Sequence, residues 1–352
     1  MALITDLVDP QELLGYTREA AIEAERNEFV LSNYLPNDTT PDGDIEFRVL
    51  RGSFRDQDAA TVRAWDAEAP IAARQGFERI MGEILPVSRK IPLGEEERLR
   101  LRGLERGLSP ANNTMLVDAI YRDAANMARA VAARFELFRG EALEKATITI
   151  NENGVAPAMI DFQRAAGHTV ALAGGALWSA IATATPVSDM RTWVQTYIDT
   201  NGVAPAYALT STAVISNLMR NAEIRALAAG PAGTPGIVTV DMVNAVFQAY
   251  GLPPFVAYDT VIRVNGVQTR PIAANKVILM PPANEPLGAT FYGTTAESLE
   301  LAEAQLIDQD QCPGMVAVPM KEGDPVRTWT LATAVGFPVL ANPNLTFTAT
   351  VQ

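Results

Sequence analysis

The clearest local signal in the sequence is SPANNTMLVDAIYRDAANMARAVAARFELFRG, from Ser109 to Gly140. Its apolar side chains recur at spacings of three or four residues, which places them on one face of a helix. They are Leu116, Ile120, Ala124, Met127, Val131, Phe135 and Phe138. Ser109, Asn113 and Thr114 are candidate N-caps, and Gly140 is a candidate stop. The pattern predicts one amphipathic helix that spans about 40 Å, which is long for an ordinary domain helix.

The N-terminal residues predict a helix followed by a connector. Asp9 before Pro10 is typical of a helix start, and a weakly amphipathic helix is predicted from Gln11 to Glu28. Such a helix gains little from packing. Residues 34–44 are rich in Pro, Asp and Gly, which indicates an extended or turning connector rather than a buried element. We therefore expect residues 1–46 to form an arm.

The arm and the residues after it differ in charge. Residues 1–46 carry eleven acidic side chains against two arginines, a net charge of -9, whereas residues 47–110 carry twelve basic and ten acidic side chains. Alternation from Ile45 onward and a polar excursion from Arg55 to Arg74 predict a long hairpin that cannot bury both faces against its own domain. Complementary charge on two protruding segments suits contacts between subunits. Two separately solvated faces are the alternative.

Beyond residue 140 the patterns mix strands and helices. Ile148 and Ile150 alternate with threonines, and Asn153-Gly154 is a turn signal, so a hairpin is predicted within residues 144–162. Helices are predicted at 189–200, 211–229 and 241–250, and strands at 255–264, 267–271, 276–280, 326–333 and 345–351. This spacing is typical of an α+β protein that ends in β-structure.

Composition excludes several classes of function. A net charge of -13 disfavours a sequence-independent grip on DNA or anionic lipid, which needs clustered basic residues. With one Cys and one His in 352 residues, neither a disulfide framework nor a Cys/His zinc site can be built within one chain. Thr169–Ser188 is uncharged, but its glycines, proline and hydroxyls keep it short of the hydropathy of a membrane span.

No constellation of residues predicts catalysis. His168 has no local serine, aspartate or second histidine, and we interpret it as structural. Cys312 has no helix N-terminus or basic neighbour in the sequence that would lower its pKa, and we interpret it as inert. The 41 carboxylates leave a glycosidase-type pair open without indicating one, and residues 174–176 and 230–236 match no phosphate-binding motif. The sequence predicts no catalytic, cofactor-binding or metal-binding residue, which favours a structural protein over an enzyme.

Short motifs and the order of parts carry a resemblance to a known family. The motifs are Trp178 to Asp189, Leu287 to Thr294, Gly323 to Thr330 and Phe337 to Asn344. The order is acidic arm, long hairpin, very long helix, short sheet, α+β region and final strands. Together they resemble the major capsid proteins of tailed bacteriophages, with the Hong Kong 97-type fold, and most of all the lambda-like capsid protein E family. The resemblance covers nearly the full chain.

The resemblance implies an α+β fold with an N-arm, an E-loop hairpin, a spine helix with a P-domain sheet, and a mixed α/β A domain. The implied boundaries are 1–46 for the arm, 47–92 for the E-loop, 93–185 for the P domain with the spine helix at about 114–139, 186–315 for the A domain, and 316–352 for C-terminal strands that return to the P domain. By family role, the loop at Gly230–Gly236 would approach the capsomer axes, and the E-loop and arm would each reach a neighbouring subunit.

The function implied by the resemblance is self-assembly. Copies would form hexamers and pentamers that close into the icosahedral head around double-stranded DNA, without sequence-specific DNA binding, cofactors or a membrane. The implied partners are further copies, a separate scaffolding protein, a portal at one vertex and, as an option, a decoration protein. The protein would assemble in the bacterial host cytoplasm and reside in the virion. An encapsulin-like nanocompartment shell and a soluble acidic hydrolase are the alternatives.

Two finer expectations depart from the type member of the fold. Only the arm precedes the E-loop, which favours a separate scaffolding protein over a fused scaffolding domain. Covalent Lys–Asn crosslinking, which occurs in some relatives, is not expected, because the hairpin tip contains no lysine. The chain has four lysines, Lys90, Lys145, Lys276 and Lys321.

Overall fold

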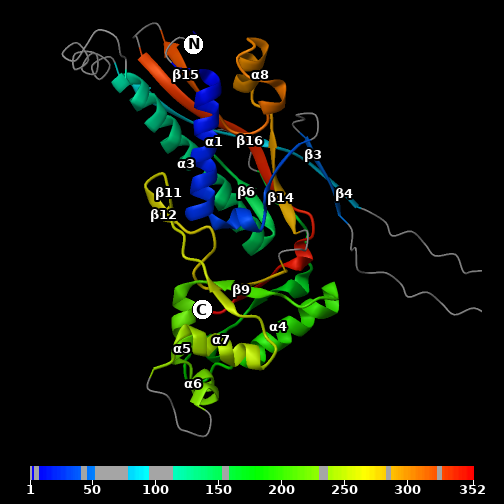
Figure 1. Ribbon diagram of the computed structural model, residues 1–352. Helices are drawn as coiled ribbons and strands as arrows, with labels where there is room; N and C mark the ends of the chain where they lie inside the picture. Colours follow the sequence, from blue (N-terminus) through cyan, green and yellow to red (C-terminus); the bar gives the residue numbers. More distant parts are fainter. Residues whose placement is uncertain are drawn as a thin grey trace, which may run out of the picture. The chain divides into compact units, whose positions relative to one another are not determined.

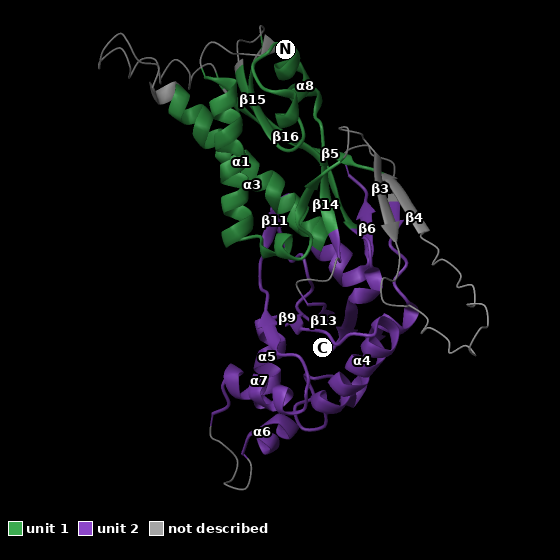
Figure 2. Ribbon diagram, turned by 45° about the vertical axis from the view of Figure 1, so that its right-hand side comes forward, with its two compact units in different colours: residues 1–48, 81–139, 289–339 green, residues 49–80, 140–288, 340–352 purple. Residues whose placement is uncertain are grey.

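The computed structural model describes residues 2–3, 8–40, 46–51, 78–94, 114–152, 158–229, 237–282, 287–322 and 327–352. The chain is divided into two compact units, shown in green and purple in Figure 2. Unit 1 comprises Met1–Arg48, Met81–Arg139 and Ala289–Val339, and unit 2 comprises Val49–Ile80, Gly140–Gly288 and Leu340–Gln352. Because each unit is assembled from separated stretches, neither forms from one continuous segment.

Unit 1 is a mixed sheet with helices packed against it (Figure 1). Its strands are β1 (Ala2–Leu3), β2 (Asn37–Thr39), β5 (Leu85–Leu93), β14 (Gly288–Gly293), β15 (Val316–Glu322) and β16 (Arg327–Leu340). Its helices are α1 (Pro10–Asn27), η1 (Val30–Asn33), α3 (Thr114–Lys145), α8 (Ala296–Glu303) and η6 (Gln309–Gln311). The strand order is β1-β15-β16-β14-β2, and β5 also pairs with β16. β3 (Glu46–Arg51) and β4 (Glu78–Glu83) form a separate two-stranded sheet.

The predicted long helix is confirmed as α3. Six residues of its apolar stripe are buried: Ile120, Ala124, Met127, Val131, Phe135 and Phe138. Near its start, Ile120, Ala124 and Met127 pack with Ala317 of β15 and Ala332 of β16. The periodicity of the sequence therefore identifies the side of the helix that faces the sheet.

The predicted stop at Gly140 is wrong, because α3 continues to Lys145. A Cβ atom at position 140 would lie 2.4 Å from the main-chain oxygen of Pro271. The glycine therefore allows the backbone of Pro271 to approach the helix closely, and it does not mark the end of the helix. The helix ends where Ala146 takes a positive φ of 54°. The guanidinium of Arg164 then donates to the carbonyls of Leu143 and Glu144 at 2.6 and 2.9 Å. A side chain thus satisfies acceptors that the helix end leaves open.

The N-terminal helix is confirmed as α1, with Asp9 as its N-cap accepting from the Gln11 N–H at 3.0 Å. The expectation that it gains little from packing is wrong. Leu13 and Leu14 are buried in the apolar clusters of unit 1. The expected exposed connector is only partly observed, since Leu35 is fully buried while β2 is exposed.

The last strand of unit 1 is longer than predicted. β16 runs through Gly336 to Leu340, beyond the expected end at Thr333. A Cβ atom at position 336 would lie 2.8 Å from the oxygen of Phe291 and 3.1 Å from the Phe135 ring. Glycine lets the strand continue where it passes close to β14 and α3.

Unit 2 contains a five-stranded sheet of order β10-β9-β13-β17-β8 with helices against it. These strands are β8 (Thr169–Ala171), β9 (Tyr207–Thr210), β10 (Phe255–Ala257), β13 (Lys276–Met280) and β17 (Phe347–Thr350). The α-helices are α4 (Pro186–Asn201), α5 (Thr212–Arg220), α6 (Ala222–Ala229) and α7 (Val240–Ala249). Two hairpins complete it, β6 (Thr147–Ile150) with β7 (Ala158–Asp161), as predicted, and β11 (Ile262–Val264) with β12 (Val267–Thr269). Three short 3-10 turns are η3 (Ala166–His168), η4 (Gly174–Ala176) and η7 (Pro343–Leu345).

The C-terminal strands are divided between two sheets. β15 and β16 pair with each other in unit 1, whereas β17 pairs with β13 and with β8, which lies within the residues 93–185 expected for the P domain. Phe347 and Ala349 point into an apolar core that also contains Trp193. Burial of these side chains accounts for the position of β17.

Two elements expected to be continuous are interrupted. The helix predicted at 211–229 divides at Asn221, whose backbone is extended and whose Oδ1 accepts from the Ile224 N–H at 3.2 Å. This side chain caps a second helix instead of continuing the first. The strand predicted at 255–264 divides into β10 and β11 around Asp259, which accepts from the Thr212 N–H at 2.9 Å.

Some predicted features lie outside the described residues. They are the polar excursion Arg55–Arg74, the cap candidates Ser109 and Asn113, the Asn153-Gly154 turn, the Gly230–Gly236 loop and the start of the motif at Gly323.

Candidate functional site

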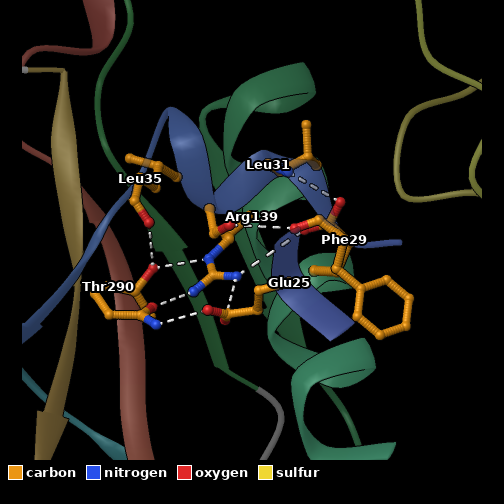
Figure 3. Close-up of polar contacts among 9 residues, drawn as sticks. Glu25, Phe29, Leu31, Leu35, Arg139 and Thr290 are labelled. Atoms are coloured by element: carbon orange, nitrogen blue, oxygen red, sulfur yellow. Dashed lines mark hydrogen bonds and ion pairs between the residues drawn. The ribbon is translucent and has the colours of Figure 1, made fainter. Parts of the chain in front are cut away.

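Unit 1 contains a buried polar cluster centred on Arg139 (Figure 3). Glu136 and Arg139 lie one turn apart on α3, and the side chains of both are fully buried. Glu25 comes from α1, Asn37 from β2 and Thr290 from β14. The cluster therefore joins three stretches of chain that are far apart in the sequence.

The guanidinium of Arg139 donates in three directions. Its Nε donates to Thr290 Oγ1 at 2.9 Å, and its terminal nitrogens donate to Glu25 Oε1 at 2.9 Å and Asn37 Oδ1 at 2.5 Å. The Asn37 amide donates in turn to Glu25 Oε2 at 2.7 Å. The planar fork of an arginine suits three acceptors in fixed positions, and the compact ammonium of a lysine does not.

Two further hydrogen bonds extend the cluster to the turn between α1 and β2. The Leu31 N–H donates to Glu136 Oε1 at 3.2 Å, and Thr290 Oγ1 donates to the carbonyl of Leu35 at 3.0 Å (Figure 3). The leucine side chains are fully buried. The cluster thus fixes the backbone of this turn as well as the position of β2.

The charges of the cluster suit a structural role, in which they hold chain segments together. Arg139 faces two carboxylates, Glu25 at 2.9 Å and Glu136 at 4.0 Å. Buried charges are tolerated only when they are paired and hydrogen-bonded, so removal of one member is costly. Burial also raises the pKa of the adjacent Tyr292, although Arg139 acts in the opposite direction. The donors of Arg139 are directed at protein acceptors, which suits positioning of chain segments.

A second arginine fastens α1. Arg18 donates to the carbonyls of Gln311, Pro313 and Met315 at 2.5, 2.9 and 3.2 Å, and burial lowers its pKa. Between them, Gly314 has a φ of 112°, a conformation that L side chains rarely adopt. Arg18 and Arg139 therefore hold residues 10–40 to the rest of unit 1.

His168 is buried in unit 2 in a structural setting. Its Nδ1 lies 3.3 Å from the carbonyl of Thr346 and its Nε2 lies 3.0 Å from Thr200 Oγ1. Burial, as the main cause, lowers its pKa, and the nearby Arg164 acts in the same direction. The ring connects α4 to the turn before β17.

Cys312 lies in the segment that Arg18 binds. Burial raises the pKa of its thiol, and Arg18 opposes this shift without reversing it. The sequence interpretation missed this basic neighbour, because Arg18 comes from a distant part of the chain. The direction of the shift disfavours the reactive thiolate.

The described residues contain neither a metal-binding group nor a membrane-spanning helix. Within the described ranges, no three His, Cys, Asp or Glu side chains are grouped so that they could hold a metal ion. In the same part of the chain, no helix combines the length and the apolar character needed to cross a membrane.

Sequence reasoning did not single out the Arg139 cluster. The only local signal is a pair of charged residues, Glu136 and Arg139, spaced by three beside the apolar stripe of a helix. Their partners are 100 or more positions away along the chain.

The fold is similar to those of solved prophage and phage-related proteins. A prophage protein from Escherichia coli CFT073, which carries a provisional assignment as a capsid protein, matches 98% of this chain and 99% of its own, with a TM-score of 0.63 and 13% identity. A phage-related protein from Bordetella bronchiseptica RB50 matches 99% of this chain and 98% of its own, with a TM-score of 0.60 and 16% identity. At these identities the likeness shows the fold alone, and it confirms the predicted Hong Kong 97-type class.

The sequence specifies the family. The profile of the family described as phage major capsid protein E matches residues 11–351, and the chain belongs to this family. The predicted capsid protein E resemblance is thereby confirmed, and the protein is a structural component of the virion capsid and not an enzyme. None of the curated proteins matches the chain.

Proposed function

We propose that copies of this chain assemble as hexamers and pentamers into the icosahedral head that encloses the double-stranded DNA of a tailed bacteriophage. The observation that carries the proposal is the family match over residues 11–351. The net charge of -13 supports it, because a wall that is not strongly basic lets packaged DNA move in and out without being bound.

The segments are proposed to have the roles of the family plan. Residues 1–46 act as the arm, 47–92 as the E-loop, 93–185 as the P domain and 186–315 as the A domain, with 316–352 supplying the last strands. The burial of Leu13 and the two arginine fastenings add that the arm also packs on its own subunit. Assembly in the host cytoplasm with a scaffolding protein, a portal and an optional decoration protein completes the proposal.

The test is expression of the protein with and without its neighbouring genes, followed by sedimentation and negative-stain electron microscopy. Closed shells, tubes or free hexamers are expected. A small species under every condition would refute the assembly proposal.

Covalent crosslinking between subunits is not expected. Three of the four lysines are engaged within their own units. Lys276 donates to Thr350 Oγ1 at 2.7 Å, Lys145 donates to Glu141 Oε1 at 3.2 Å, and the Lys90 ammonium lies 4.8 Å from the centre of the Trp329 ring. A denaturing gel of mature particles should show a single monomer band, and a ladder above it would contradict this expectation.

A further inference from the structure

One edge of β14 is covered by β2. β14 pairs with β16 on one side, and among the described strands β2 covers the other, with Thr290–Tyr292 opposite Asn37–Thr39. β14 reads Gly-Ala-Thr-Phe-Tyr-Gly, and its threonine and aromatic residues favour β-structure. An uncovered edge of this kind is a template for pairing with a strand of another chain.

β2 is, by contrast, a poor template. It has three residues, all with exposed side chains, and its central residue is the charged Asp38. In the sequence, Pro36 precedes it and Pro41 follows it within two residues. Short length, charge and proline are the features that block pairing at sheet edges. Adding β2 to the sheet therefore replaces an edge that can pair with one that cannot.

The Arg139 cluster holds this cover in place. The exposed side chains of β2 contribute little apolar burial, and pairing over three residues is weak. Asn37 of β2 and Thr290 of β14 instead bind the same guanidinium, at 2.5 and 2.9 Å. Arg139 thus aligns the covering strand with the strand that it covers.

We propose that Arg139 is a positioning residue that holds β2 over the edge of β14, and that this cover stops copies of the chain from pairing with one another through β14 during assembly. The partner excluded is a second copy of this chain. The second half of the proposal rests on the proposed capsid function, whereas the first half concerns the subunit alone.

The first test is Arg139→Lys, which keeps the charge and most of the side-chain length but removes the fork. Hydrogen exchange at the Thr40 and Thr290 amides, which donate to Tyr292 and Pro36, should become at least about tenfold faster. Amides of unit 2 should be unchanged. The matched control is Arg129→Lys on the same helix, whose ion pair with Glu28 is half exposed and should not matter. Unchanged exchange in Arg139→Lys would overturn the positioning role.

The second test distinguishes the docking of β2 on β14 from the protection of this sheet edge against pairing with another copy. Pro36→Thr with Asp38→Val leaves the Arg139 contacts in place but turns β2 into an edge that can pair. Exchange at Thr40 should match the wild type, while electron microscopy and sedimentation should show irregular aggregates in place of closed particles. Arg139→Lys should give the same aggregates.

The protective role of β2 and the assembly of the protein are tested separately. Normal particles from both variants, under conditions in which the wild type assembles, would overturn the protective role of β2. Failure of the wild type to assemble would instead count against the proposed function. In that setting, a monodisperse Arg139→Lys variant with faster exchange at Thr40 would also overturn the protective role, because β14 would then be open without pairing.

Discussion

Unit 1 and unit 2 each take in a strand from near a chain end, but they hold it by different means. β2 lies at the edge of its sheet with exposed side chains, and the fully buried Arg139 fixes it by donating to Asn37. β17 lies between β13 and β8, with Phe347 and Ala349 buried in an apolar core.

The difference follows from where each strand lies. An edge strand with exposed side chains has little apolar area to bury, so directional contacts must set its position. An interior strand is held by burial that depends on area and shape more than on direction. We therefore expect unit 1 to respond sharply to the loss of one charged group and unit 2 to respond gradually to changes of apolar shape.

The largest effect is expected for Arg139→Met. It leaves Glu25 and Glu136 buried without their cation, and loss of one member of a buried ion pair costs about 3–5 kcal/mol. Urea-dependent hydrogen exchange can report the free energy of unfolding of each unit separately. The free energy of unfolding of unit 1 should fall by this amount, and that of unit 2 should hardly change. A fall in unit 1 below about 1 kcal/mol would show that unit 1 does not depend on this charged group.

Gly140→Ala tests how far unit 2 depends on shape. Alanine favours a helix over glycine by about 1 kcal/mol, but here its Cβ would meet the Pro271 carbonyl at 2.4 Å. We expect net destabilisation of unit 2 by about 1–3 kcal/mol, as for other overpacked sites. Gly15→Ala in α1 is the matched control, since no atom lies within 4 Å of the added Cβ. That control should stabilise unit 1, and equal effects at the two sites would contradict the steric argument.

A smaller effect is expected for Phe347→Leu. Phe347 stacks on Trp193 with ring centres 5.9 Å apart and is almost fully buried. A swap that keeps much of the apolar volume usually costs less than about 1.5 kcal/mol. Thermal and urea unfolding should show a modest loss with β17 still protected from exchange. Release of β17 would show that unit 2 is as dependent on one side chain as unit 1.

The sequence predicts the helices and strands of both units better than the long-range contacts that hold them in place. The apolar stripe of α3 and the Asp9 cap of α1 depend on neighbours within four residues, and both are confirmed. Gly140 was misjudged because the atom that requires it belongs to Pro271. Arg139 was missed for the same reason, since its partners Glu25 and Asn37 lie far away in the sequence. Contacts of this range leave no periodic trace in a sequence.

The smallest expected effect concerns pH and unit 2. Burial lowers the pKa of His168 below its ordinary value of 6.5, so the fold favours the neutral ring. Its contribution to stability should be complete above pH 6.5 and should be lost as the pH falls from there through the folded pKa, with a slope of at most about 1.4 kcal/mol per unit.

The matched variant is His168→Gln, which cannot titrate in this range. The difference in the free energy of unfolding between wild type and variant should be flat above pH 6.5 and should fall below it. Unit 1 contains no histidine, because His168 is the only one in the chain, and it serves as an internal reference. A difference that stays flat, or that grows in acid, would show that the contacts to Thr346 and Thr200 hold the charged ring as well as the neutral one. Unit 2 would then tolerate a buried charged side chain, as unit 1 does.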